Sequence, residues 1–168
     1  MSDARAQADH AWELMLRIKI GLLVTHDQRG GELRARPVHA HPTPGENAIY
    51  FLTDADSAKV YEIAENRNVC IAFVDTSSQK YVSVSGTASL SDDRAKIKEF
   101  WTASDKSFWT DENDPRIRVV KINACEAEYW DNFSTTFAAI KIAIAAVTGG
   151  KPNLGENAKV DLKRGAAI

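Results

Sequence analysis

The alternation of apolar and polar residues along the chain predicts a fold made mainly of β-strands. Short runs rich in Val, Ile, Leu and aromatic residues are separated by turn residues, such as the DQRGG of residues 27–31. In YVSVSGTASLS, Val82 and Val84 alternate with more polar positions, which predicts a strand with one face on the core. The predicted strands cover residues 20–26, 32–41, 48–53, 69–75 and 81–91, with two further short strands in 117–131 that meet near Ala124.

Helical periodicity appears between and beyond these strands. Residues 4–19 place Ala8, Trp12 and Met15 at spacings of four and three residues, as on one face of a helix. Further helices are predicted over 57–66, capped by Ser57 or Asp56, over 92–101, with acidic residues at its positive end, and over 134–148, ended by Gly149 and Gly150.

The order of these elements favours a small barrel over a layered α/β fold. Strands do not alternate regularly with helices, and no internal repeat is present. We therefore predict a mainly β, α+β domain over residues 1–149, with six to seven antiparallel strands that protect their edges by closing, and with peripheral helices. Residues 150–168 are predicted to be a polar C-terminal tail, and the sequence leaves open whether it packs on the barrel.

Composition narrows the class of protein. The 168 residues are 44% hydrophobic and 26% charged, with a net charge of -2 and basic residues dispersed along the chain. Dispersed charge argues against nucleic-acid or membrane-surface binding. No apolar run is long enough for a membrane span, and the N-terminus lacks an apolar signal core, so a cytoplasmic location is expected. Cys70 and Cys125 lie in no CxxC or Cys/His cluster, which argues against a zinc site.

The stretch YFLTDADSAK, residues 50–59, carries the first candidate chemistry. A predicted strand ends here and a helix begins, so free backbone N–H groups and the positive end of a helix dipole are close together. Thr53 and Ser57 add neutral hydroxyl donors, and Lys59 adds a positive charge. The combination suits a phosphate monoester. An ordinary capped helix with a solvated lysine would explain the same residues.

The stretch LRARPVHAH, residues 33–41, is the second candidate. Pro37 cannot donate a hydrogen bond to a neighbouring strand, so the strand is expected at an edge, where it could present Arg36 and backbone groups to a ligand. Alternate residues that simply face water are the other interpretation. His39 and His41 share a strand face, but no third ligand is evident, and no metal site is predicted.

Several stretches, taken in order, resemble one known family. They are RARPV, YFLTDADSAKVYEI, NRNVCIAFVD, YVSVSGTASLSDD, EAEYWD and TGGKPNLGENAKV. The chain resembles the pyridoxamine-phosphate-oxidase-like flavoproteins, and more narrowly the bacterial general stress protein group among them. The resemblance implies an FMN-binding split barrel, and a homodimer with FMN at its interface.

The resemblance also implies which residues would hold FMN. Thr53, Ser57 and Lys59 match the family's phosphate grip, together with Leu52 and Asp54. Arg36 matches the arginine that opens the flavin-contacting strand, and Pro37 and Val38 would pass close to the isoalloxazine ring. Trp130 matches a tryptophan that lines the cofactor, which in a dimer would be the flavin of the second copy.

Departures from the family pattern limit the activity that can be expected. Ala58 stands where the oxidase has a phosphate-loop arginine, and His41 stands at its substrate-contacting lysine. The segment after Trp130 lacks the histidine and arginines that complete the oxidase site, so pyridoxamine phosphate oxidation is not expected. Phe108–Trp109–Thr110 replaces a Phe-Pro-Gly-like turn, which predicts a pocket of different shape.

Three functions follow from the resemblance. The first is an FMN-dependent oxidoreductase of unknown substrate, in which FMN supplies the redox chemistry and His41 and Tyr81 are weak candidates for contact with the substrate. The second is a non-catalytic FMN-binding or stress-response module. The third keeps the barrel and changes the ligand to a deazaflavin or to haem, for which His39 or His41 would be the axial ligand.

Overall fold

The computed structural model describes residues 2–27, 31–131 and 156–163, and within them a single antiparallel sheet dominates. The sheet follows the order β2-β1-β5-β6-β7-β4-β3, and β8 pairs with β7 beside this path. Every pair of neighbouring strands is antiparallel. The strands are β1 (Ile20–His26), β2 (Leu33–His39), β3 (His41–Thr43), β4 (Ala48–Asp54), β5 (Asn68–Asp75), β6 (Lys80–Ser91), β7 (Ile117–Asp131) and β8 (Glu156–Asp161). The predicted split-barrel, α+β class is confirmed.

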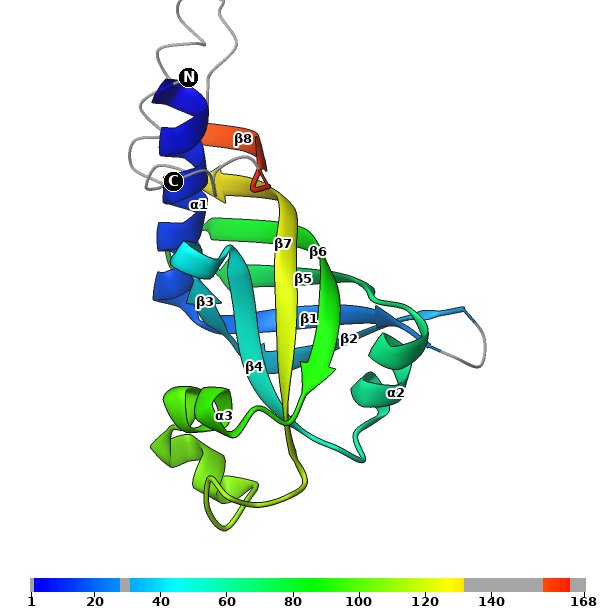
Figure 1. Ribbon diagram of the computed structural model, residues 1–168. Coiled ribbons are helices and arrows are strands. Elements are labelled where there is room, and N and C mark those ends of the chain that lie inside the picture. Colours follow the sequence, from blue (N-terminus) through cyan, green and yellow to red (C-terminus); the bar gives the residue numbers. More distant parts are fainter. Residues whose placement is uncertain (1, 28–30, 132–155, 164–168) are drawn as a thin grey trace, which may run out of the picture.

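Helices cover the open parts of the sheet (Figure 1). Helix α1 (Ser2–Ile18) runs across the strands and contacts β3, β5, β6, β7 and β8. Helix α2 (Ala58–Glu65) contacts β1 and β6, whereas α3 (Arg94–Phe100) contacts β4 and β7. Short 3-10 helices lie at η1 (Pro44–Glu46) and η2 (Ala103–Ser107). The predicted helix over 134–148 falls outside the described residues.

The main core lies between α1 and the inner face of the sheet. Ala11, Leu14 and Met15 on α1 are fully or almost fully buried, because they follow the helical spacing that places one stripe on the sheet. The strands contribute alternate residues to the same core, including Phe51, Ile71, Phe73, Val82, Val84 and Tyr129. A smaller cluster around Trp109, Phe100 and Ile97 packs under α3 and η2. Within the described residues, no helix is long and apolar enough to cross a membrane.

The predicted single strand over 32–41 is wrong, and the break explains how the barrel nearly closes. β2 pairs with β1, whereas β3 pairs with β4 on the other edge of the sheet. The buried Ala40 lies between them, and its N–H donates to the carbonyl of Lys19 instead of to a neighbouring strand (2.8 Å). One continuous stretch of chain therefore joins the two ends of the sheet.

The two predicted short strands in 117–131 are also wrong, because β7 is one strand of 15 residues. Its register against β6 shifts between Ser85 and Gly86, so that Cys125 is an extra residue opposite this point. Such a β-bulge bends a strand without ending it. Gly86 is needed at the bulge, since a Cβ there would lie 2.5 Å from the carbonyl oxygen of Asn123.

Part of the predicted C-terminal tail packs on the barrel. β8 pairs with residues 126–131 of β7, and Ala158, Val160 and Leu162 are buried against the main core. These three residues alternate with polar ones, as expected of a strand with one buried face. The boundary drawn at residue 149 between a domain and a tail stays a prediction.

Candidate functional site

The junction between β4 and α2 gathers three of the predicted phosphate-binding side chains. Thr53 is the buried, penultimate residue of β4, and its Oγ1 accepts a hydrogen bond from Lys59 Nζ (2.9 Å). Ser57 occupies the N-cap position of α2, but its hydroxyl contacts Thr53 Oγ1 (3.0 Å) and makes no capping bond to the backbone. The first turn of α2 therefore keeps backbone N–H groups that a ligand can use.

Lys59 is a half-buried cation at this junction. Burial lowers the pKa of its ammonium group, and the positive charge of Arg36 lowers that pKa further, against the opposing effects of Glu62 and Asp54. Among the described residues, no carboxylate lies within ion-pair distance of Lys59. A desolvated ammonium without a counter-ion is stabilised when an anionic ligand binds beside it. Lys59 thus places a positive charge without a carboxylate partner at this junction.

A cavity of about 320 Å³ opens at the same junction. Its walls come from β2, β4, the start of α2 and the segment around η2. The lining residues are Pro37, Val38, His39, Leu52, Thr53, Asp54, Ser57, Lys59, Asp105, Phe108 and Trp109. The structure therefore brings most of the predicted cofactor residues around one cavity, and leaves out Arg36 and Trp130.

Arg36 does not line the cavity, and its guanidinium belongs to a part-buried polar network. Its guanidinium donates to both carboxylate oxygens of Glu62 (2.6 and 3.2 Å) and to Thr25 Oγ1 (3.1 Å). Burial would raise the pKa of Glu62, but the hydrogen bonds from Arg36 and Thr25 outweigh it and lower that pKa. The direct partner of Arg36 is thus a carboxylate of α2. Its positive charge also lowers the pKa of Lys59, although burial is the larger cause.

Trp130, Tyr81 and His41 do not line the cavity within one chain. Trp130 on β7 pairs in register with Tyr81 on β6, and both are partly exposed. His41 lies beside His39 (ring centroids 4.8 Å apart) and against Phe100 (4.9 Å). Burial, followed by the charge of His39, lowers the pKa of His41. The proposed substrate and cofactor roles of these three residues stay predictions.

Four residues that line this cavity were not among the residues predicted to bind FMN: His39, Asp105, Phe108 and Trp109. The sequence had named His39 only as a possible haem ligand, and Phe108 and Trp109 only as part of an altered turn. A capping box between Thr102 and Asp105 stabilises η2, which holds this segment at the cavity. The indole N–H of the buried Trp109 donates to Asp54 (3.3 Å), whereas Phe108 is 74% exposed. The departure from the family pattern at residues 108–110 indicated that the pocket has a different shape. It did not show which side chains line that pocket.

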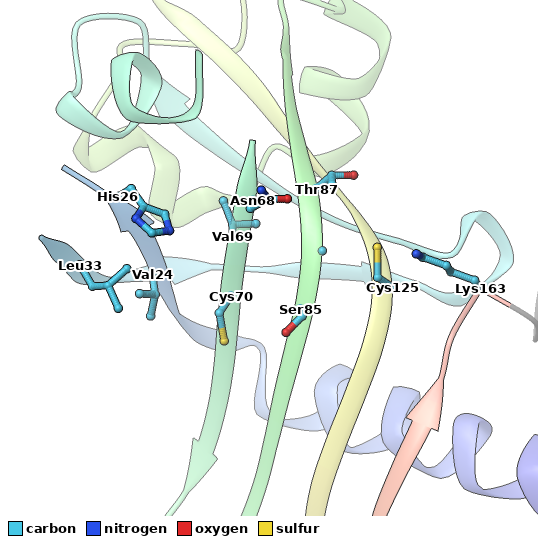
Figure 2. A pocket seen from close by; sticks show the side chains of 11 residues that line it. Val24, His26, Leu33, Asn68, Val69, Cys70, Ser85, Thr87, Cys125 and Lys163 are labelled. Atoms are coloured by element: carbon cyan, nitrogen blue, oxygen red, sulfur yellow. The ribbon is translucent and has the colours of Figure 1, made fainter. Parts of the chain in front are cut away.

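A second cavity, of about 450 Å³, lies on the outer face of the sheet (Figure 2). Strands β1, β2, β5, β6 and β7 contribute to it, and Figure 2 shows Cys70, Ser85 and Cys125 on neighbouring strands across it. Both cysteines are free. Exposed apolar side chains occupy the same region of the sheet: Ile20, Leu22, Leu33 and Val74. Among the described residues, no group of three or more His, Cys, Asp or Glu is placed to hold a metal ion.

Comparison with known proteins assigns this architecture to a family. The sequence model of the family described as pyridoxamine 5'-phosphate oxidase like matches residues 6–153. The chain belongs to this family. The resemblance inferred from the sequence is thereby confirmed. The matched residues include all those that line the cavity, most of α1, and strands β1 to β7.

Individual relatives are distant. Protein bli-3 of Neurospora crassa is 24% identical over 144 residues, which span 80% of this chain and 69% of that protein. The crystal structure of a protein assigned as general stress protein 26 from Jannaschia sp. CCS1 aligns with a TM-score of 0.74 and 24% identity, over 93% of this chain and 99% of that one.

Two further structures widen the comparison. General stress protein 26 of Bacillus anthracis aligns with a TM-score of 0.61 and 25% identity, over 71% of this chain and 93% of that one. A pyridoxamine 5'-phosphate oxidase-related, FMN binding protein from Nostoc punctiforme aligns with a TM-score of 0.52 and 15% identity, over 75% and 81% of the two chains. At such identities these structures support the fold.

Proposed function

We propose that this protein binds FMN in the cavity at the β4–α2 junction and acts as a flavin-dependent oxidoreductase of unknown substrate. The observation that carries the proposal is Lys59, a half-buried ammonium bonded to Thr53 and lacking a carboxylate partner among the described residues. Two further findings support the choice of ligand: the chain's membership of the family, and a structural neighbour whose name states that it binds FMN.

The residues present fit FMN. The ammonium of Lys59 and the hydroxyls of Thr53 and Ser57 would hold the phosphate, in the way that charged and neutral donors share a phosphate dianion. Pro37, Val38 and Leu52 provide the apolar wall that an isoalloxazine ring requires. When bound, FMN would supply the hydride chemistry, while these side chains bind and orient it and exclude water. Ala58 offers no second cation to the FMN phosphate, so Lys59 carries more of that contact. Because His41 stands at the oxidase's substrate-contacting lysine, pyridoxamine phosphate oxidation is not proposed.

We further propose a homodimer formed through the outer face of the sheet. This face carries Ile20, Leu22, Leu33 and Val74, which are each between 42% and 65% exposed. Large apolar side chains gathered on one face are typical of an interaction surface. The same face continues along β2 to Pro37 on the cavity wall, because Leu22 pairs with Pro37 in register. A second copy would therefore lie next to the flavin. The free cysteines are consistent with a cytoplasmic location.

The test is a titration of cofactor-free protein with FMN, followed by gel filtration of the complex. The proposal expects the bound fraction to keep the yellow absorption of oxidised flavin, and to bind FMN more tightly than riboflavin, which lacks the phosphate. Equal affinity for the two would contradict the phosphate site. Reduction of the bound flavin by a nicotinamide cofactor, coupled to reduction of an added acceptor, separates an oxidoreductase from a non-catalytic FMN module. A deazaflavin or haem would be recognised by its own spectrum.

Replacing Trp130 by alanine tests the dimer and the shared site together. If Trp130 contacts the flavin of the second copy, Trp130→Ala should weaken FMN binding by about 1–3 kcal/mol, the usual effect of losing an aromatic stacking partner. The thermal unfolding of the isolated chain should change little, since Trp130 is partly exposed. Tyr61→Ala, at an exposed aromatic residue that does not line the cavity, is the matched control. A wild-type titration curve for Trp130→Ala would remove this residue from the site.

A further inference from the structure

The cavity on the outer face of the sheet contains nucleophilic and charged side chains that the proposed FMN site does not use. The thiols of Cys70 and Cys125 line it together with the imidazole of His26 and the ammonium of Lys163. Both cysteines are free and partly exposed. At about 450 Å³ the cavity has the size of sites that hold small molecules. It therefore combines two thiols and a cation with room for a small ligand.

The β-bulge in β7 determines where Cys125 lies. Cys125 is the extra residue opposite the step from Ser85 to Gly86, and a bulge redirects the side chain of the residue that it contains. Figure 2 shows Cys125 on the strand next to Ser85, and both line the cavity. Within the described part of the chain, the Cys125 thiol has one weak contact, to the carbonyl oxygen of Asn123 (3.8 Å). The thiol is thus accessible from the cavity.

Cys70 is too far from Cys125 for the two to form a disulfide within one chain. Cys70 on β5 pairs in register with Ser85 on β6, so β6 separates it from Cys125 on β7. Two strand spacings amount to about 10 Å, whereas the Cα atoms joined by a disulfide usually lie within about 7 Å of each other. The Cys70 thiol is also in contact with the hydroxyl of Ser83 (3.4 Å). A disulfide at Cys125 therefore needs a partner from outside the chain.

Lys163 gives this side of the cavity a positive charge. The backbone N–H of its neighbour Leu162 donates to the carbonyl of Cys125 (3.1 Å), which fixes the residues after β8 against the bulge. Figure 2 shows the side chain of Lys163 extending from there towards Cys125. The nearby carboxylate of Glu126 is paired with Lys159 (2.8 Å), and among the residues described no carboxylate lies at ion-pair distance from Lys163. The charge of Lys163 is therefore available to an anionic partner of the thiol.

The apolar side chains assigned above to a dimer lie mainly at the other end of this face. β1 runs from Ile20 to His26 and pairs antiparallel with β5, so that Ile20 and Val74 lie at one end of the strands and His26 lies at the other. Leu33, opposite His26, reaches the cavity. Cys125 lies on β7, and β5 and β6 separate it from β1. A second copy that covers the apolar end therefore does not need to cover Cys125.

We propose that Cys125 is a modification site, at which a negatively charged disulfide of low molecular weight forms a mixed disulfide in the outer-face cavity. The Cys125 thiolate attacks one sulfur of the incoming disulfide, whose own sulfur–sulfur bond breaks as the new bond forms. The released thiolate takes up the proton that Cys125 has lost, so that Cys125 is oxidised and the released half is reduced. Lys163 attracts the carboxylates of the incoming molecule. The reaction does not involve FMN.

The experiment incubates the reduced full chain with oxidised glutathione, an anionic disulfide, and with cystamine, a cationic one. Mass spectrometry of the protein and of its peptides is expected to show a single glutathione on Cys125, which a reducing agent removes. Cys125→Ser should lose this adduct, whereas Cys70→Ser should keep it.

Lys163→Glu tests the attraction by charge. It should lower the rate of reaction with oxidised glutathione about fivefold, an effect of the size expected for one pair of charges in water, and it should raise the rate with cystamine. High salt should reduce both effects. Lys98→Glu makes the same change of charge at an exposed position on α3 and should leave both rates unchanged.

Three results would overturn the proposal. An unmodified wild type, or an adduct on Cys70 in place of Cys125, would refute the modification site. A disulfide between Cys70 and Cys125, seen as a loss of mass without an adduct, would contradict the separation of β5 from β7. If Lys163→Glu changed the rates with both disulfides in the same direction, Lys163 would not act by attracting an anion.

Discussion

Replacing Lys59 by methionine is expected to weaken FMN binding by about 1–3 kcal/mol, which is the usual contribution of a charged hydrogen bond. Methionine keeps the apolar stem of the lysine and removes the ammonium that contacts Thr53. Ala58 leaves no arginine beside it to compensate. Riboflavin binding should change little, because riboflavin has no phosphate. Isothermal titration of cofactor-free protein with both ligands provides the measurement.

The pH dependence of binding should follow the same residue. Only the protonated Lys59 attracts a phosphate, and burial lowers its pKa below the ordinary value of 10.5. The affinity of the wild type for FMN should therefore fall as the pH rises through this lowered pKa, whereas Lys59→Met should lack this alkaline loss. A variant in which Lys98 is replaced by methionine removes one charge from an exposed position on α3 and controls for net charge. Equal loss of affinity in both variants would place the phosphate elsewhere.

Removing the guanidinium of Arg36 should have the largest effect on stability. Arg36→Met leaves the carboxylate of Glu62 buried with Thr25 as its remaining hydrogen-bond donor, at a side chain that is 5% exposed. An uncompensated buried charge typically costs 3–5 kcal/mol, and because Arg36 itself is 21% exposed we expect about 2–4 kcal/mol here. Urea unfolding of the cofactor-free protein measures this difference without involving the ligand.

The free energy of unfolding at acidic pH tests whether the Arg36–Glu62 ion pair is the cause of this difference. The pKa of Glu62 is lowered in the folded chain, so its ion pair stabilises the fold above the ordinary pKa of 4.5, and this contribution is lost as the pH falls through the lowered value. In Arg36→Met, Glu62 can be protonated at higher pH, and the difference from the wild type should narrow in acid. Adding Glu62→Gln to Arg36→Met should recover part of the stability. Arg34→Met breaks the exposed pair with Asp27 and should change stability much less than Arg36→Met. A similar cost for both arginine variants would contradict a buried network.

The opposite roles of two neighbouring cations are explained by their partners. Arg36 has a carboxylate partner, and we expect it to stabilise the fold. Lys59 is also partly buried but has no carboxylate partner among the described residues, so it is available to a ligand. A half-buried, unpaired ammonium also destabilises the empty protein, so Lys59→Met should unfold at a higher urea concentration than the wild type when FMN is absent. Loss of binding together with a gain in stability is the signature of a residue retained for a ligand.

The sequence by itself determined the local features of this protein. Alternating burial in residues 81–91, the helical spacing in residues 4–19 and the acidic start of α3 all depend on neighbours in the chain, and all are found in the structure. The same holds for the β4–α2 junction, because Thr53, Ser57 and Lys59 lie within seven residues and meet through local geometry. A match to the family's order of motifs gave the fold and the expected ligand.

Only the tertiary structure decided how distant residues meet. At Ala40 the chain passes from β2, which pairs with β1, to β3, which pairs with β4, so the two edge strands of the sheet are consecutive in the chain. The sequence pattern does not predict this break, because the same alternation of residues continues through both strands. That closure places His39 in the lining of one cavity with Asp105 and Phe108. It also brings Arg36 on β2 within hydrogen-bond distance of Glu62 on α2. β8 is similar, since its three alternating apolar residues find a buried face only once β7 lies beside them. Such contacts depend on where the sheet bends and closes, and that is set by the packing of the whole core.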